Sequence, residues 1–404
     1  HGLERVVTVD IGGTSSDMAV CTPSRPDVTT QTWLGALPLI TPTVNVTAIG
    51  AGGGSLVRVD SHGLLKVGPE SAGADPGPVC YGRGGAQPTI TDCYLTLGLL
   101  RSDGFAGGRM LLDRDAARVA LDKIGAQLGF GSTDRAVKAA AAALSVATSN
   151  MATEMLKDLA RRGVDPNEVV LLPFGGAGPT HAAMLAEEVR IQRITVPPAP
   201  GLFCAFGALA ADARRDFIRM VKRPLDDRSA LMAKDHFATL TQEAQQWLAE
   251  EGPLIGSRTF LLSADMSYVG QAYEINVDLP VEPDITVAAL GASFHEAHHR
   301  LYGFADPEAP IELQNVRVQA VGAMTRPRPA QWQPREGVAS TTRRNVWQAD
   351  DWLEFQVAQR DVLTVGATLK GPTLVEQPDT TVFIPSGWTA HVLGDGTLMM
   401  EKKQ

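Results

Sequence analysis

The stretch Val6-Val7-Thr8-Val9-Asp10-Ile11-Gly12-Gly13-Thr14-Ser15-Ser16-Asp17-Met18-Ala19-Val20 decides the fold of the N-terminal half. Residues 6–9 form a β-branched, apolar run that is typical of a strand, and residues 18–20 form a second one. The glycines lie between these two runs. The stretch therefore predicts a β-hairpin with a glycine tip.

The tip of this hairpin has groups suited to phosphate. Gly12 and Gly13 let the backbone approach an anion closely, and Thr14 and Ser15 add hydroxyl and N–H donors. Asp10, at the end of the first strand, is placed to hold a hydrated magnesium ion or to orient a water for attack on a phosphoryl group. An ordinary glycine turn is the alternative, and no lysine follows the glycines as it does in a Walker loop.

A second glycine turn occurs in Phe174-Gly175-Gly176-Ala177-Gly178-Pro179-Thr180-His181, after an apolar strand signal at 169–172. Pro179 suits the start of a helix, and a helix N-terminus offers free N–H groups and a positive dipole. We expect a nucleotide here, with its base and ribose against the glycines; a tight strand–helix connection is the alternative. His181 is as suited to a structural hydrogen bond as to catalysis.

Three further motifs leave alternatives open. Residues 50–55 either close over phosphate oxygens or form a simple hairpin. The rigid loop 70–85 includes Cys80, a nucleophile only if a base lies near it, and a scaffold or interface role is favoured. His295 and His299 lie four apart, as in a metal pair, but surface histidines are common and no HExxH motif is present.

The order of the elements predicts an α/β layer followed by strands. Helices are expected at 113–128, with Ser132 or Thr133 capping the next one, and they alternate with strands up to about residue 220. A helix at 230–252 and mostly short strands from Phe260 onward follow. We expect three regions: a nucleotide-binding α/β core at 1–220, an α+β region at 221–325 and a β-rich region at 326–404. Residues 326–330 read as a proline-rich linker.

The composition is that of a globular protein. Hydrophobic residues make up 44% of the 404, and no run of 18 apolar residues occurs, which argues against a membrane span. A net charge of −9 argues against a broad nucleic-acid-binding surface. Four scattered cysteines without a CxxC pair, and no secretory signal, fit a reducing cytoplasm. Because the first residue is His1, we expect a fragment or a processed subunit.

These motifs, taken in order along the chain, resemble the hydantoinase A / 5-oxoprolinase family. The stretch 10–17, the loop 70–85 with Pro88 to Asp92, and the stretch 174–181 are similar to that family. So are residues 196–201, the stretch Asp265-Met266-Ser267-Tyr268-Val269-Gly270-Gln271, Tyr302-Gly303-Phe304, and residues 371–388. The resemblance implies a ribonuclease H-like ATPase core, as in actin, Hsp70 and sugar kinases, followed by a β-rich C-terminal region.

The resemblance also implies a function. It indicates a subunit or fragment of an ATP-dependent cyclic-amide hydrolase that phosphorylates a substrate amide or enol oxygen. It is expected to use ATP with Mg²⁺ or Mn²⁺, to act on a small molecule, and to be inactive without its partner segments. The alternatives are the ATP-using subunit of a ketone carboxylase and a non-catalytic scaffold subunit. A sugar kinase is the third candidate. It would have its phosphate hairpin near the N-terminus of a complete chain and a full second α/β lobe, which the strand-rich C-terminal half of this sequence does not offer.

The family usually has a further VDxGGTxTD hairpin in an N-terminal domain, whereas this chain has one such motif, at 10–17. The expected partners are therefore a hydantoinase B-type subunit and an N-terminal hydantoinase A-type domain or chain, with no nucleic acid and no membrane. Ser267 stands where the family often has an arginine. Asp10 and Asp17 are the candidate catalytic residues, and Asp10 is the candidate metal ligand. The candidate cofactor-binding residues are Gly12, Gly13, Thr14, Ser15, Gly53, Gly54, Gly175, Gly176, Ala177 and Gly178.

Overall fold

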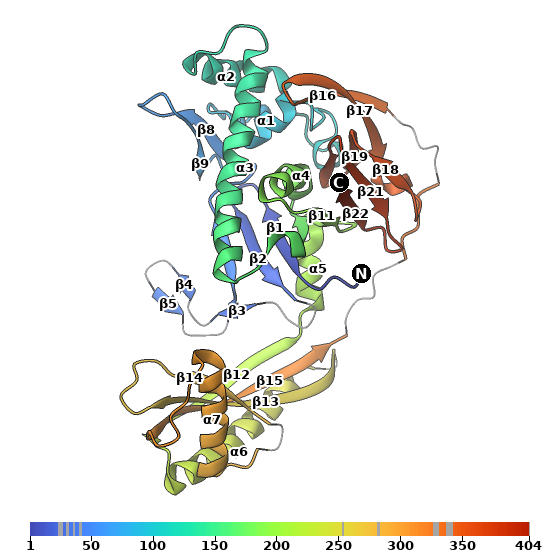
Figure 1. Cartoon of the computed structure of the whole chain (residues 1–404). Helices are drawn as coiled ribbons and strands as arrows, with labels where there is room; N and C mark the ends of the chain where they lie inside the picture. The colour runs from blue at the N-terminus through green and yellow to red at the C-terminus, as the bar shows by residue number, and fades with distance from the viewer. Residues whose placement is uncertain are drawn as a thin grey trace. The chain divides into compact units, whose positions relative to one another are not determined.

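The structure is a computed structural model that describes residues 1–22, 27–29, 32–34, 37–39, 43–252, 254–280, 283–325, 331–336 and 342–403. The chain forms two compact units, one of His1–Cys204 with Pro329–Gln404 and the other of Ala205–Arg328 (Figure 1). The sequence-based division at 220 and 325 differs from this one, because C-terminal strands join the main sheet of the first unit. The expected linker at 326–330 lies outside the described residues.

The main sheet of the first unit has eight strands in the order β18-β21-β22-β11-β10-β1-β2-β7. Its strands are β1 (Val6–Ile11), β2 (Ser16–Cys21), β7 (Val46–Ile49), β10 (Val170–Phe174), β11 (Arg193–Val196), β18 (Thr368–Lys370), β21 (Trp388–Val392) and β22 (Leu398–Lys402). The strands β1 and β2 pair antiparallel, which confirms the predicted hairpin. The strands β1 and β10 pair parallel, as expected in an α/β layer.

Helices cover this sheet, and the longest of them, α3, lies across β1 and β2 (Figure 1). The helices of this unit are α1 (Ile90–Thr96), α2 (Arg114–Gln127), α3 (Arg135–Arg161) and α4 (Gly178–Val189). The helix α5 (Phe203–Ala210) begins at the end of the first unit's N-terminal segment and continues into the second unit, which starts at Ala205. The predicted helix at 113–128 is confirmed as α2, which Asp113 caps by accepting a hydrogen bond from the Ala116 N–H. The expected cap of α3 by Ser132 or Thr133 is wrong, because its N-cap is Asp134 in a left-handed conformation with no side-chain cap.

The helix α1 lies within residues 48–102, a stretch whose many glycines and prolines predict only strands and ordered loops. All seven of its residues are buried. The Thr89 side chain accepts a hydrogen bond from the Asp92 N–H, and the Asp92 side chain accepts one from the Thr89 N–H, which is a capping box. The helix forms because this reciprocal cap and complete burial compensate for its short length.

The other strands of the first unit form smaller sheets. One sheet has the order β16-β17-β19-β20, with β16 (Thr342–Gln348), β17 (Asp351–Gln359), β19 (Thr373–Gln377) and β20 (Thr380–Ile384). Short pairs are β3 (Val28–Thr29) with β6 (Thr43–Val44), and β4 (Thr32–Leu34) with β5 (Leu37–Leu39). The predicted β-rich C-terminal region is confirmed, and its strands contribute to the same hydrophobic core as β1 and β10.

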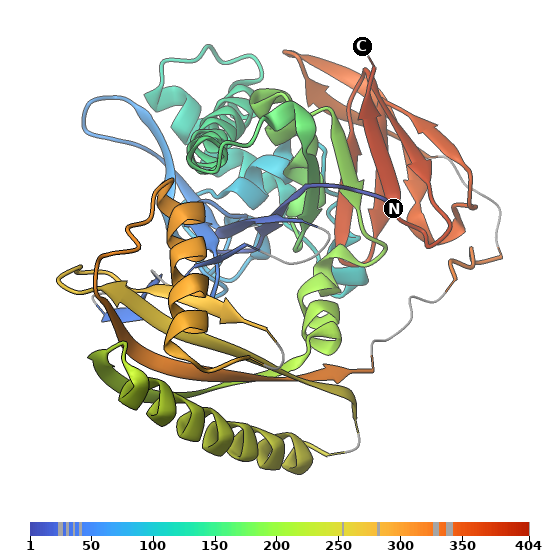
Figure 2. The ribbon, with the colours of Figure 1, turned by 60° about the horizontal axis from the view of Figure 1, so that its bottom comes forward.

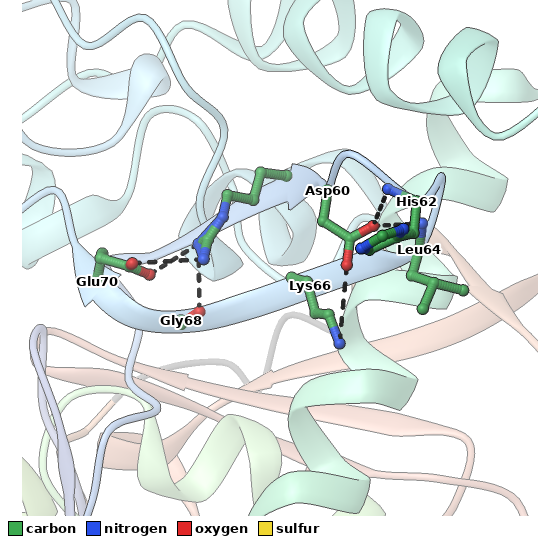
Figure 3. A network of polar contacts seen from close by, with 7 residues as sticks. Asp60, His62, Leu64, Lys66, Gly68 and Glu70 are labelled. Carbon is green, nitrogen blue, oxygen red and sulfur yellow. Dashed lines mark hydrogen bonds and ion pairs between the residues drawn. The ribbon is translucent and has the colours of Figure 1, made fainter.

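A hairpin of β8 (Ser55–Val59) and β9 (Leu65–Ser71) follows the loop at 51–54. Figure 3 shows how its turn is fixed: the Asp60 carboxylate accepts hydrogen bonds of 2.9 Å from the N–H groups of His62 and Leu64. The bond from Leu64 is the main reason why the pKa of Asp60 is lowered. Nearer the base of the hairpin, Arg58 pairs with Glu70 at 2.7 Å. These contacts fix the strands that leave the loop at 51–54.

The second unit is a four-stranded antiparallel sheet in the order β12-β15-β13-β14. Its elements are β12 (Ala213–Pro224), α6 (Asp227–Glu250), β13 (Ile255–Tyr268), β14 (Ile275–Leu279), α7 (Val287–Tyr302) and β15 (Ile311–Met324). The helix α6 runs alongside the long strands (Figure 2). Both helices contribute to one core, through residues such as Phe237 of α6 and Phe294 of α7. None of the helices in the described ranges combines the length and the apolar character needed to span a bilayer.

Candidate functional site

Parallel pairing of β1 and β10 brings the two glycine turns together. Asp10, near the end of β1, lies opposite Phe174 at the end of β10. The carboxyl ends of neighbouring parallel strands meet at one edge of a sheet, which is where open α/β sheets bind ligands. The Ala177 N–H donates a 3.0 Å hydrogen bond to the Ile11 carbonyl oxygen, so the two turns are bonded directly.

The hairpin tip is supported from behind by the loop at 51–54. The Gly12 N–H donates to the Ser15 carbonyl across the tip at 3.1 Å. The N–H groups of Gly53 and Gly54 donate to the carbonyls of Gly12 and Gly13 at 2.9 and 2.6 Å. A Cβ on Gly54 would lie 2.7 Å from the Gly13 oxygen, so this approach requires a glycine. The structure thus places Gly53 and Gly54 against the hairpin tip, as a wall behind it.

Two carboxylates face each other across the hairpin. Asp10 and Asp17 are directly opposed in the β1–β2 register. Partial burial, followed by the charge of Asp10, raises the pKa of Asp17. Like charges at opposed positions of a strand pair are destabilising, so the pair favours a cation between or beside the two groups. The Cys204 thiol donates a 3.1 Å hydrogen bond to Asp10 Oδ2.

The donor set at this pair fits a magnesium ion bound together with a nucleotide. Magnesium sites commonly use one or two carboxylates together with phosphate oxygens and waters. No group of three or more His, Cys, Asp or Glu side chains in the described part of the chain is arranged to hold a metal by itself. A divalent cation at Asp10 and Asp17 would therefore take most of its ligands from a phosphate and from water.

A cavity of about 930 Å³ opens over the two glycine turns. This volume is within the range of small-molecule sites in proteins. Five of the candidate cofactor-binding residues line it: Gly12, Gly13, Gly53, Gly176 and Ala177. The other candidates are not part of the lining. Thr14, Ser15, Gly54, Gly175 and Gly178 belong to the two turns and their supporting loop, whereas Asp10 and Asp17 lie on the strands β1 and β2. The helix α4 begins beside the cavity without a side-chain cap, so its first N–H groups can serve an anion.

The C-terminal segment forms a wall of this cavity that the sequence reasoning missed. The Thr380 hydroxyl donates to the Gly176 carbonyl oxygen at 2.8 Å, and the Thr180 hydroxyl donates to the Thr381 carbonyl at 2.7 Å. Asp379 accepts a hydrogen bond from the Gly201 N–H at 2.8 Å. The resemblance of residues 371–388 to the family was a signal for this wall, but nothing local in the sequence places them beside 176.

A charged network continues along the same wall. The buried Glu376 carboxylate accepts hydrogen bonds from Arg344 at 2.6 Å, Gln359 at 3.0 Å and Arg101 at 3.4 Å. Arg360 is also buried and donates to three backbone carbonyls, of which the shortest bond is 2.7 Å to Gly396. Burial lowers the pKa of Arg360 to about 10. Most polar groups of the wall are thus held by the protein itself.

His181 has a structural hydrogen-bonding position. Its side chain is fully buried, with Nδ1 2.8 Å from the Tyr94 hydroxyl and Nε2 3.0 Å from the Thr148 hydroxyl oxygen. Because Thr148 donates its own proton to the Leu144 carbonyl, His181 Nε2 donates to Thr148 and Nδ1 accepts from Tyr94. His181 therefore connects α1, α3 and α4 behind the second glycine turn.

Two other sequence hypotheses lose their support. Cys80 is fully buried, and this burial, together with the nearby Asp92 carboxylate, raises the pKa of its thiol far above the usual range, so Cys80 is not an activated nucleophile. His295, one member of the proposed pair with His299, has its Nδ1 3.0 Å from the Tyr268 hydroxyl, so this nitrogen has a partner within the protein. Among the described residues, neither histidine belongs to a group of three or more His, Cys, Asp or Glu side chains that could hold a metal.

An α/β core with two adjacent strands ending in glycine turns over one cavity defines a protein with an ATPase-like core. Two family models match the chain: hydantoinase/oxoprolinase over residues 1–217, and the hydantoinase/oxoprolinase C-terminal domain over residues 226–403. The chain belongs to the hydantoinase/oxoprolinase family.

Relatives named as enzyme subunits are similar to this chain over almost its whole length. The caprolactamase subunit alpha of Pseudomonas jessenii is 34% identical over 96% of this chain and 57% of its own length. The acetophenone carboxylase gamma subunit of Aromatoleum aromaticum is 33% identical over 99% of this chain and 57% of its own length. The chain thus spans less than three-fifths of the length of these relatives.

Solved structures give the same result for the fold. The nucleotide-free structure of acetone carboxylase superposes with a TM-score of 0.84 at 26% identity, and covers 99% of this chain and 59% of the other. The structure of the ATP-dependent caprolactamase from Pseudomonas jessenii superposes with a TM-score of 0.76 at 30% identity, and the match covers 100% of this chain and 59% of the caprolactamase chain.

Proposed function

We propose that the chain is the nucleotide-binding part of an ATP-dependent cyclic-amide hydrolase. The observation that supports this most is the direct bonding of the two glycine turns over one cavity, beside the opposed pair Asp10 and Asp17. A caprolactamase subunit is among the relatives, and the solved caprolactamase is ATP-dependent. In this proposal the terminal phosphoryl group of ATP is transferred to the amide oxygen, which makes the amide carbon electrophilic toward water.

Each part of the site has a role in this proposal. Thr14 and Ser15 at the hairpin tip donate to phosphate oxygens, with Gly12 and Gly13 allowing the close approach. Asp10 and Asp17 position a magnesium or manganese ion on the phosphates, because like charges at directly opposed positions are relieved by a cation. The turn from Gly175 to Gly178 and the start of α4 shape the nucleotide pocket.

A test of this function uses the full assembly with its partner segments. Asp10→Asn should lower ATP turnover by roughly 100-fold or more, since positioned carboxylates typically contribute this much. Asp115→Asn, on an exposed position of α2, is the matched control and should leave turnover unchanged. Wild-type turnover in the Asp10→Asn assembly would reject the proposed role of the site.

Partner segments are part of the proposal, because the chain spans 57% of the caprolactamase subunit and the relatives are named as subunits. We infer a B-type subunit and an N-terminal hydantoinase A-type segment, in the cytoplasm, where four unpaired cysteines stay reduced. Native and denaturing mass of the purified assembly, with ATP titrated by calorimetry on the same sample, tests this. ATP binding without any further chain or segment would contradict it.

A ketone carboxylase subunit is the second candidate, because the acetone carboxylase structure gives the higher TM-score of the two structures. The two candidates differ in their substrates. ATP turnover stimulated by cyclic amides supports the hydrolase, whereas stimulation by ketones together with bicarbonate supports the carboxylase. A scaffold role predicts no ATP binding by the assembly and no effect of changes at Thr14 or Gly176.

A further inference from the structure

The loop at 70–85 delivers an aromatic side chain to the cavity over the glycine turns. Tyr81, at the end of the short 3₁₀ helix Val79–Tyr81, lines that cavity, and so does Phe105. The two rings lie 5.6 Å apart between centroids at an interplanar angle of 47°. Both rings are half-buried and rest on a small core cluster that includes Cys80 and Leu95. They form an aromatic surface in the wall of the cavity, with one side packed and one side open to it.

The position of Tyr81 is fixed before any ligand binds. The fully buried Asp92 carboxylate accepts hydrogen bonds from the N–H groups of Cys80 at 2.7 Å and Val79 at 3.2 Å. It also accepts from the N–H and hydroxyl of Thr89 at 2.8 and 2.9 Å. Four donors on one buried carboxylate hold the 3₁₀ helix against the start of α1. A pre-positioned aromatic side chain loses little conformational entropy on binding.

The chemistry around the two rings differs from that of the glycine turns. Leu100 lies beside the two rings, and the Arg101 guanidinium is held by Asp103 at 2.8 Å and by Glu376 at 3.4 Å. Burial is the main reason why the pKa of Tyr81 is raised to about 12, so its ring stays neutral. Flat aromatic faces with a few fixed polar groups suit a planar ring with polar edges, whereas glycine N–H groups suit phosphate.

We propose that Tyr81 and Phe105 form a subsite for a planar nitrogen-containing group in the wall of the cavity. Two groups of the proposed reaction have this chemistry: the base of ATP and the planar amide of the cyclic substrate. The inference rests on the proposed function, because it assumes that the cavity holds a nucleotide. In this proposal the loop at 70–85 takes part in binding: the Cys80 N–H holds the loop to Asp92, and the Tyr81 ring contacts the ligand.

The experiment uses Tyr81→Leu and Phe105→Leu in the full assembly, with Tyr81→Phe as the conservative variant that keeps the ring. Tyr273→Leu, which changes a highly exposed tyrosine of the second unit, is the matched control. Calorimetry gives Kd for ATP and for tripolyphosphate, which has no base. Steady-state kinetics at saturating ATP give KM for caprolactam, 5-oxoproline and hydantoin. Melting curves identify any variant that fails to fold, and the second leucine variant then tests the subsite.

If the subsite holds the base, both leucine variants weaken ATP binding about tenfold and leave tripolyphosphate binding unchanged. If it holds the substrate ring, ATP binding is unchanged and KM for the active cyclic amide rises about tenfold. Tyr81→Phe and Tyr273→Leu behave as wild type in either case. Leucine variants that match wild type in all these measurements would overturn the subsite alone. A wild-type assembly that binds neither ATP nor tripolyphosphate would overturn the proposed function, and the subsite with it.

Discussion

Gly175 follows β10 and lies against the carboxylate of Asp10, where only a residue without a side chain fits. Its φ is +76°, in the left-handed region. A Cβ there would lie 2.6 Å from the Ile11 carbonyl oxygen and closer still to Asp10 Oδ1. A side chain at this position would therefore disturb both the bond between the glycine turns and the orientation of Asp10.

Gly175→Ala should lower the free energy of unfolding by about 2–4 kcal/mol, from left-handed strain together with the clash at Ile11 and Asp10. It should also weaken ATP binding, because Asp10 is displaced. Chemical denaturation and calorimetry measure the two effects. Gly176→Ala is the matched control: the nearest atom to its added Cβ is the Asp379 carbonyl oxygen at 3.8 Å. We expect its stability to change by less than about 0.5 kcal/mol. Equal stabilities of the two variants would contradict this account.

His181 makes the stability of the first unit depend on pH. Burial lowers its pKa from 6.5 to about 4. As the pH falls, the unfolded chain takes up the proton first, so the stabilisation is complete above pH 6.5 and is lost progressively toward pH 4. A shift of this size corresponds to at most about 3 kcal/mol.

NMR of the protein labelled with ¹⁵N-histidine measures this directly. The expected spectrum has a neutral ring with the proton on Nε2 down to about pH 5, because Nδ1 accepts from Tyr94 and Nε2 donates to Thr148. A His181 ring that takes up its proton near pH 6.5 would disprove the buried network.

Among the elements, α1 depends most on one side chain, because the Asp92 carboxylate closes its N-terminal cap and also holds the 3₁₀ helix Val79–Tyr81. Asp92→Asn replaces an acceptor oxygen with an NH₂ group that faces donors. We expect the free energy of unfolding to fall by about 2–4 kcal/mol. Asp113→Asn at the exposed N-cap of α2 is the control, and it should cost less than about 0.5 kcal/mol because asparagine caps as well as aspartate. Similar losses in the two variants, measured by urea denaturation, would show that Asp92 has no special role.

These elements also show what the sequence could predict. The β1–β2 hairpin and the strand–turn–helix at 170–189 follow from local signals, namely β-branched runs, glycine turns and Pro179, so both were predicted. The helix α1 was missed although its capping signal, Thr89 to Asp92, is in the sequence, because the surrounding glycines and prolines suggested only loops. The direct bond between the two turns and the wall at 376–381 depend on pairing between distant strands, which local patterns do not specify.

At the scale of the whole molecule, three of the C-terminal strands, β18, β21 and β22, complete the main sheet, whereas β16, β17, β19 and β20 form a sheet of their own. The strand β22 pairs with β11 from Arg193 opposite Glu401 to Val196 opposite Leu398, and β21 pairs with β22. Trp388, Leu398 and Met400 are buried in the core that β1 and β10 share. The site therefore depends on residues from both ends of the chain.

A truncation after residue 386 tests this dependence. It removes β21 and β22, leaves β11 as an open edge, and deletes buried side chains that typically contribute about 2–5 kcal/mol each, which together approach the stability of a whole domain. We expect calorimetry to show that the unfolding transition of the first unit is lost, while the second unit, with its own core, keeps its transition. Removing only residues 403 and 404 is the control, since among the described residues it breaks one backbone hydrogen bond, from the Lys403 N–H to the Gly387 carbonyl, and it should preserve both transitions. If the long truncation also kept both transitions, the C-terminal strands would be an addition to a sheet that is stable without them.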